Sequence, residues 1–194
     1  MSDKEKGKKK KGNSHWPLKV FLMSVAVSAV LSFFSSTALT GASYVIALLV
    51  LTAFIGLGII FDMIGVAVTA ADPRPFHSMA AHKEKGGREA VKLLSKANEV
   101  SSFCNDVVGD ICGVVSGTAS ATIAAQVIAH LDFGWPQFIS LAMSALVAGL
   151  TVGGKAVGKT IAVSSCTEIV HAVGNVIYWF THLLQPKGKK KKKR

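Results

Sequence analysis

The residues best suited to chemistry are five oxygen-bearing side chains near the ends of two apolar segments. Asp106 and Asp110 lie one helical turn apart, Ser102 and Asn105 are beside them, and Asp62 lies near the end of the preceding apolar segment. A charged side chain within hydrocarbon costs roughly 3 kcal/mol or more, so such residues mark an ion path, a proton path or a buried polar network. Several convergent oxygens suit a hard divalent cation. We predict a cation site formed by these five residues.

The carboxylates leave three interpretations open. They bind a divalent cation, they carry protons, or they lie in the headgroup region, where they are hydrated or pair with Arg88 or Lys96. The third interpretation fits Asp106 best because it is closest to the membrane interface. Asp62 and Asp110 are expected to lie deeper, where an unpaired charge is more costly.

The elements that position these residues are long apolar segments. Half of the 194 residues are apolar and 17% are charged, with the charges crowded into a few stretches. A bilayer core about 30 Å thick needs about 20 apolar residues in a helix. The predicted spans are 20–39, 43–71, 101–129 and 136–154. The chain is therefore predicted to be an all-α polytopic membrane protein with four transmembrane helices.

Lysine and arginine are concentrated before the first span, between the second and third, and after the last. Basic residues are retained on the cytoplasmic side, so four spans with both termini inside place all three basic regions there. We expect a multi-pass protein of the cytoplasmic (plasma) membrane. The first span exceeds the apolar core of a signal peptide, about 7–15 residues, so we interpret it as a span.

The remaining segments surround this bundle. Residues 72–98 are predicted to form a cytoplasmic helical hairpin around a Gly-Gly break. Residues 161–184 alternate apolar and polar stripes at a spacing of three to four, which is typical of an amphipathic helix lying in the membrane interface. The membrane domain then covers 17–185, and residues 1–16 and 186–194 are predicted to be disordered basic cytoplasmic tails.

The tails carry most of the net charge of +11. Anionic lipid headgroups attract basic residues by about 1 kcal/mol each, and RNA, for example a ribosome near the membrane, offers phosphates as an alternative partner. No aromatic residues interleave with the lysines to stack on bases, so lipid is the favoured partner. The residues in question are Lys8, Lys9, Lys10, Lys11, Lys189, Lys190, Lys191, Lys192, Lys193 and Arg194.

Small residues recur every four positions along the third span. The stripe begins with Gly109, Gly113, Gly117 and Ala121. Small residues let transmembrane helices approach closely, either within one subunit or between two. We expect a homodimer built by this span or the fourth.

Two short motifs resemble the transmembrane domain of the cyclin M/CorC (CNNM/CorB) magnesium transporter family, over roughly residues 42–184. The connection 86–94 reads GGREAVKLL where the family has G-n-r-r-A-…-L-L, and 154–162 reads GKAVGKTIA where it has G-E-x-x-P-K-x-I-A. The resemblance implies a homodimer with an inward-facing acidic cavity for Mg²⁺. The family's nucleotide-binding CBS pair has no counterpart in this sequence, so no nucleotide is expected.

The second motif also carries the main departures. Lys155 replaces the family's acidic residue and Gly158 its proline, while Gly154 and Lys159 match and are predicted to contribute to the motif or to gating. A lysine repels a cation in a low-dielectric cavity. Two functions follow: transport of Mg²⁺ or a related transporter-like role, or, alternatively, a non-transporting scaffold that recruits lipid, RNA or a membrane partner. No nucleophile–base set or phosphate loop suggests an enzyme.

Overall fold

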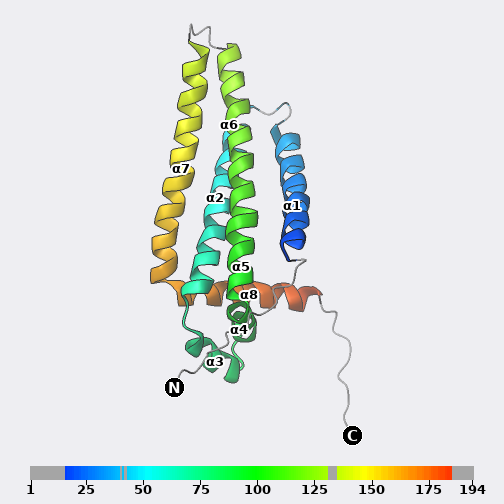
Figure 1. Ribbon diagram of the computed structural model, residues 1–194, viewed down its shortest axis with the longest axis vertical. Coiled ribbons are helices and arrows are strands. Elements are labelled where there is room, and N and C mark those ends of the chain that lie inside the picture. The colour runs from blue at the N-terminus through cyan, green and yellow to red at the C-terminus, as the bar shows by residue number, and fades with distance from the viewer. Residues whose placement is uncertain (1–15, 40, 42, 131–134, 185–194) are drawn as a thin grey trace, which may run out of the picture.

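The computed structural model describes residues 16–39, 41, 43–130 and 135–184, and every element within these ranges is a helix (Figure 1). Four helical stretches are long and apolar enough to cross a membrane. They are Phe21–Leu39, Tyr44–Ala70, Ala97–Ala129 and Pro136–Ser164. The prediction of an all-α polytopic membrane protein with four such helices is confirmed.

The helices follow each other in the order α1 (Trp16–Leu39), α2 (Tyr44–Ala70), α3 (Pro73–Ala81), α4 (Gly87–Ser95), α5 (Ala97–Ser102), the π-helix η1 (Phe103–Gly109), α6 (Asp110–His130), α7 (Pro136–Ser164) and α8 (Cys166–Leu184). The long helices run alternately up and down, and α8 lies across one end of the bundle with α3 and α4 beyond it (Figure 1). We call this end, formed by α3, α4 and α8, the collar end. The first residues of α1 lie at the same end.

The fourth long helix differs most from its sequence prediction. It continues without interruption to Ser164, where the prediction ended the span at residue 154. The amphipathic helix accordingly begins at Cys166 and not at Ile161. The glycines of α7 do not end the helix because two of them pack against α2. As a consequence, Lys155 and Lys159 belong to a membrane-spanning helix. The predicted basic tails, including Lys8–Lys11 and Lys189–Arg194, lie outside the described residues.

At the collar end, a capping hydrogen bond begins α3, and the backbone of the hairpin packs closely against α8. The Asp72 side chain accepts a hydrogen bond of 2.9 Å from the backbone N–H of Arg74, which begins α3 after the second span. Within the hairpin, Gly86 directly precedes α4 and has a φ of +77°, a conformation that favours glycine. A Cβ on Gly174 of α8 would lie only 2.6 Å from the Gly86 carbonyl oxygen. The hairpin and α8 are therefore held in direct backbone contact.

The third span presents two different faces. Val107, Val115 and Ala119 are buried against neighbouring helices. Gly113 and Gly117 have no atom within 4 Å of the position that a Cβ would take. The small-residue stripe predicted from the sequence is therefore packed within the subunit at Gly109, and it is open from Gly113 onwards.

Candidate functional site

The charged part of the bundle depends on how α7 packs against α2. A Cβ on Gly154 would overlap the side chain of Ile59, and a Cβ on Gly158 would lie 2.9 Å from Met63 Cγ. These two glycines let the helices approach closely, and each is followed directly by a lysine. The motif residues Gly154, Lys155, Gly158 and Lys159 therefore form one unit, in which the glycines bring α7 close to α2 and the lysines reach neighbouring carboxylates.

Asp62 on α2 is the buried carboxylate of the bundle, with only 4% of its surface exposed. Its Oδ2 atom lies 3.7 Å from Lys159 Nζ, and the lysine side chain remains about half exposed. Within the described residues this oxygen accepts no hydrogen bond. A buried carboxylate needs a partner of opposite charge, and Lys159 is that partner within the bundle.

Asp110 on α6 forms the second ion pair, in which the lysine is the more buried partner and the carboxylate the more exposed one. Its Oδ1 atom lies 3.8 Å from Lys155 Nζ, and here the carboxylate is 74% exposed while the lysine is 20% exposed. Lys155 Nζ also donates a hydrogen bond of 3.4 Å to the carbonyl oxygen of Gly109. The buried partner of this pair is therefore the cation, and it has a second acceptor in the backbone.

Asn105 belongs to the π-helix η1, which interrupts the third span. Its Nδ2 atom donates to Ser101 Oγ at 3.4 Å, whereas its buried Oδ1 atom has no hydrogen-bond partner among the described residues. A Cβ on Gly65 would overlap this carboxamide oxygen, so Asn105 presses directly against α2. Gly65 is three residues after Asp62 and hence on the same face of α2. π-Helical turns are frequent at functional sites.

The structure separates the oxygens that the sequence placed together. Asp62 and Asp110 contact different lysines, Asp106 is exposed, and Ser102 is half-buried. Among the described residues, no three His, Cys, Asp or Glu side chains are grouped so that they could hold a metal ion. The suggested pairing with Arg88 or Lys96 is wrong for Asp62 and Asp110, because α7 supplies their partners and Lys96 pairs with Glu99 at 3.8 Å.

Lys159 is the functional residue whose role the sequence analysis missed. It was assigned to a motif and not to a carboxylate. The signal was present in the spacing of Lys155 and Lys159, four residues apart in an otherwise apolar helix, because residues at that spacing lie on one helical face. Two basic side chains on one face of a transmembrane helix predict two acidic partners on the neighbouring helices, because unpaired charges within hydrocarbon are costly.

Comparison of the chain with known protein families, with curated proteins and with solved structures found no match. The resemblance to magnesium transporters therefore stays a prediction that rests on the two motifs.

Proposed function

We propose that this protein is a non-transporting membrane scaffold in which lysines of α7 neutralise carboxylates of α2 and α6. We call the four residues of these two ion pairs, Asp62, Asp110, Lys155 and Lys159, the charged layer. The observation that carries the proposal is the pairing of Lys159 with Asp62 and of Lys155 with Asp110, at 3.7 and 3.8 Å. Each ammonium group takes the electrostatic role that a bound cation would have. The scaffold acts through its charged cytoplasmic face, with anionic lipid as the favoured partner of the basic tails and RNA as the alternative.

The energy of bringing in an ion supports this assignment. Two unit charges about 4 Å apart repel by roughly 4 kcal/mol at an effective dielectric constant near 20, and a divalent cation beside one lysine is repelled about twice as strongly. Mg²⁺ would have to displace Lys159 before it could use Asp62. The side chain of Lys155 is itself largely buried, so it has little room to withdraw from Asp110.

The orientation follows from the distribution of charge. Arg74, Lys83, Arg88, Lys92 and Lys96 all belong to the collar end or its connections. By the preference of basic residues for the inner side, we place this end in the cytoplasm of a cell bounded by the plasma membrane. Both termini are then cytoplasmic.

The scaffold is proposed to be a homodimer. Gly117 on α6 and Gly149 and Gly153 on α7 have open space where a Cβ would be. The groove between the two helices, of about 200 Å³, is lined by Ser120, Ser144 and Thr151 among others. Ser120 Oγ is buried and has no hydrogen-bond partner within the described residues. Close backbone approach and hydroxyl hydrogen bonds are what associate helices in lipid, so a second copy fits this groove.

Magnesium binding tests the scaffold proposal. The purified full-length protein is titrated with MgCl2 in detergent while its melting temperature is followed, with CaCl2 and with KCl at equal ionic strength as controls. The scaffold proposal expects no saturable stabilisation of the wild-type protein by Mg²⁺. A saturable shift that Asp62→Asn removes, and that Glu168→Gln on the exposed surface of α8 does not, would overturn it.

Cation transport is the second candidate function, and the unpartnered oxygens favour it. Among the described residues neither Asp62 Oδ2 nor Asn105 Oδ1 accepts a hydrogen bond, and Lys159, which lies 3.7 Å from Asp62 Oδ2, is half exposed and could move away from it. Its withdrawal would leave a carboxylate and a carboxamide oxygen for a cation, as magnesium transporters of the resembled family require. In proteoliposomes, this function predicts Mg²⁺ uptake that Asp62→Asn abolishes and that the matched variant Asp106→Asn, at an exposed carboxylate, retains.

The dimer is tested separately by its small residues. Gly117→Leu together with Gly153→Leu fills the groove and should convert the dimer to a monomer in light scattering after size-exclusion chromatography. Val114→Leu, on an exposed position of the same helix, is the control and should leave the mass unchanged. A wild-type protein that is monomeric in mild detergent and in nanodiscs contradicts the dimer.

A further inference from the structure

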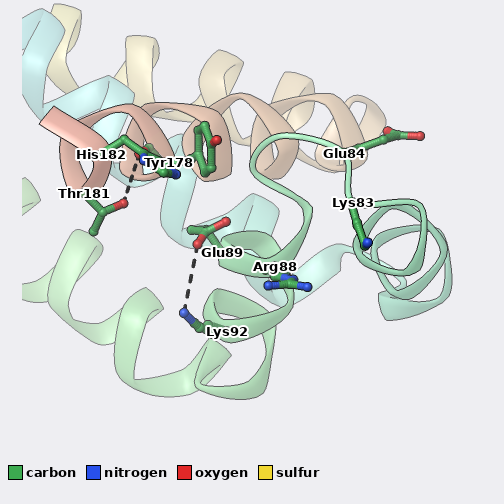
Figure 2. Close-up of a pocket in the computed structure, with 8 residues that line it drawn as sticks. All are labelled: Lys83, Glu84, Arg88, Glu89, Lys92, Tyr178, Thr181 and His182. Carbon is green, nitrogen blue, oxygen red and sulfur yellow. Dashed lines mark hydrogen bonds and ion pairs between the residues drawn. The ribbon is translucent and has the colours of Figure 1, made fainter. Parts of the chain in front are cut away.

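A cavity at the collar end lies apart from the two ion pairs that carry the function proposed above. It lies between the α3–α4 hairpin and α8, has a volume of about 390 Å³ and is partly open. Figure 2 shows that basic side chains from the hairpin and polar side chains from α8 surround it. Those that matter for binding are Lys83, Arg88, Lys92, Tyr178 and His182.

Three basic side chains, Lys83, Arg88 and Lys92, and two acidic ones, Glu84 and Glu89, line the cavity, which leaves it an excess of positive charge. Lys92 pairs with Glu89 at 4.0 Å, so that pair adds little net charge. Among the described residues, neither Lys83 nor Arg88 forms an ion pair, and the Glu84 carboxylate points away from both (Figure 2). An ammonium and a guanidinium group are thus left to face the same cavity. A guanidinium group binds phosphate with two parallel N–H donors, and a lysine adds a point charge.

The backbone at the hairpin directs one of these groups. Lys83 has a φ of +58°, which is uncommon for a residue with a Cβ. The turn is closed by hydrogen bonds from the N–H of Lys83 to the carbonyl of Ala80 at 3.3 Å and from the N–H of Glu84 to the carbonyl of Met79 at 3.0 Å. This turn places Lys83 at the cavity, where Glu84 also contributes to the lining but directs its carboxylate away from Lys83 (Figure 2).

The position of the cavity relative to the bilayer suggests its ligand. On α8, Val176, Phe180 and Leu183 are large exposed apolar residues. Tyr178, Thr181 and His182 line the cavity from the opposite side of the helix. An interfacial helix buries its apolar face about 5–10 Å into the boundary between headgroups and acyl chains, and a helix with side chains is about 10 Å across. The cavity side of α8 therefore lies at the level of the lipid headgroups.

We propose that this cavity binds the phosphate group of an anionic phospholipid headgroup. Arg88 and Lys83 hold the phosphate oxygens, and the hydroxyl group of Tyr178 is within the same cavity to donate a further hydrogen bond. The acyl chains pass beside the apolar face of α8 into the bilayer. The inference concerns a site outside the spans and holds whether or not the spans conduct an ion.

The test uses the purified full-length protein and short-chain lipids that are soluble in detergent. Dioctanoyl phosphatidylglycerol is titrated while the melting temperature is followed, with dioctanoyl phosphatidylcholine and inorganic phosphate as separate arms. We expect a saturable stabilisation by phosphatidylglycerol alone. The double variant Lys83→Gln/Arg88→Gln should weaken the apparent affinity at least about tenfold, as expected for the loss of charge-assisted hydrogen bonds.

The matched control is Arg74→Gln/Lys96→Gln, which removes one arginine and one lysine from exposed positions near the collar end that do not line the cavity. It should retain the wild-type affinity, which separates a built site from attraction to the general positive charge. Equal weakening in the two double variants would overturn the proposal, as would an unchanged affinity in Lys83→Gln/Arg88→Gln. Stabilisation by inorganic phosphate at the same concentrations would overturn the lipid as ligand and identify a site for free phosphate. Both altered pairs are exposed, so the variants are expected to fold.

Discussion

The two ion pairs of the bundle have opposite patterns of burial. At the Asp62 site, formed by Asp62, Lys159 and Asn105, the carboxylate is buried and its lysine is half exposed. At the Asp110 site, formed by Asp110, Lys155 and Gly109, the lysine is largely buried and the carboxylate is exposed. The two ion pairs therefore have similar distances between charges, 3.7 and 3.8 Å, but differ in which partner is shielded from solvent.

The comparison shows that the cost of losing a partner depends on which partner stays buried. Removal of one member of a buried pair leaves an uncompensated charge, whereas an exposed pair contributes little. The two sites also differ in how closely neighbouring residues pack around them. At the Asp62 site Asn105 presses against Gly65, while beside the Asp110 site Gly113 faces open space. One site is closely packed and the other is partly open.

The largest effect is expected from Lys159→Met, which leaves the buried Asp62 carboxylate without a counter-charge. The free energy of unfolding in mixed detergent micelles should fall by about 3 kcal/mol, the lower part of the range for a broken buried pair because Lys159 is half exposed. The double variant Asp62→Asn/Lys159→Met should recover most of this loss. Equal losses for Lys159→Met and for Lys155→Met, which leaves only an exposed carboxylate, would break the comparison.

Gly65→Ala tests whether the Asp62 site is closely packed. Its Cβ would overlap the Asn105 carboxamide, so α2 and η1 must separate or Asn105 must rotate, at a cost of about 1–3 kcal/mol in unfolding free energy. The double variant with Asn105→Ala supplies the missing space and should restore stability. A fully stable single variant would show that the packing around Asp62 is loose.

Asp110→Asn leaves Lys155, whose side chain is 20% exposed, without its carboxylate but with its hydrogen bond to the Gly109 carbonyl, so the effect should be modest, about 1 kcal/mol. The same unfolding measurement checks this value. Its dependence on salt sharpens the result, since an exposed pair is screened by added NaCl. A loss as large as that of Lys159→Met would mean that the two sites do not differ.

The smallest effect is expected from Gly113→Ala, one turn along α6 from Gly109. Within the subunit nothing lies within 4 Å of the new methyl group, so the stability of the subunit itself should not fall when it is measured under conditions where the protein is monomeric. At most it rises by about 0.5–1 kcal/mol, the advantage of alanine over glycine within a helix. A loss comparable to that of Gly65→Ala would indicate that a neighbour covers this face in the membrane.

Part of the charged layer could be predicted from residue types, and part could not. The burial of Asp62 and the polar character of Asn105 followed from their places within apolar segments. The pairing did not follow, because Arg88 and Lys96 are closer in sequence to the carboxylates than Lys155 and Lys159 are. Helix rotation and the glycine contacts Gly154–Ile59 and Gly158–Met63 bring the distant lysines nearer.

The sequence by itself determined four membrane-length helices and an amphipathic helix after them, because the thickness of hydrocarbon and the helical period act over neighbouring residues. Only the tertiary structure decided which carboxylate each lysine meets, where the small-residue stripe opens, and that the hairpin and α8 enclose a basic cavity. These features depend on the axial rotation and close approach of helices far apart in the chain, and no local pattern specifies them.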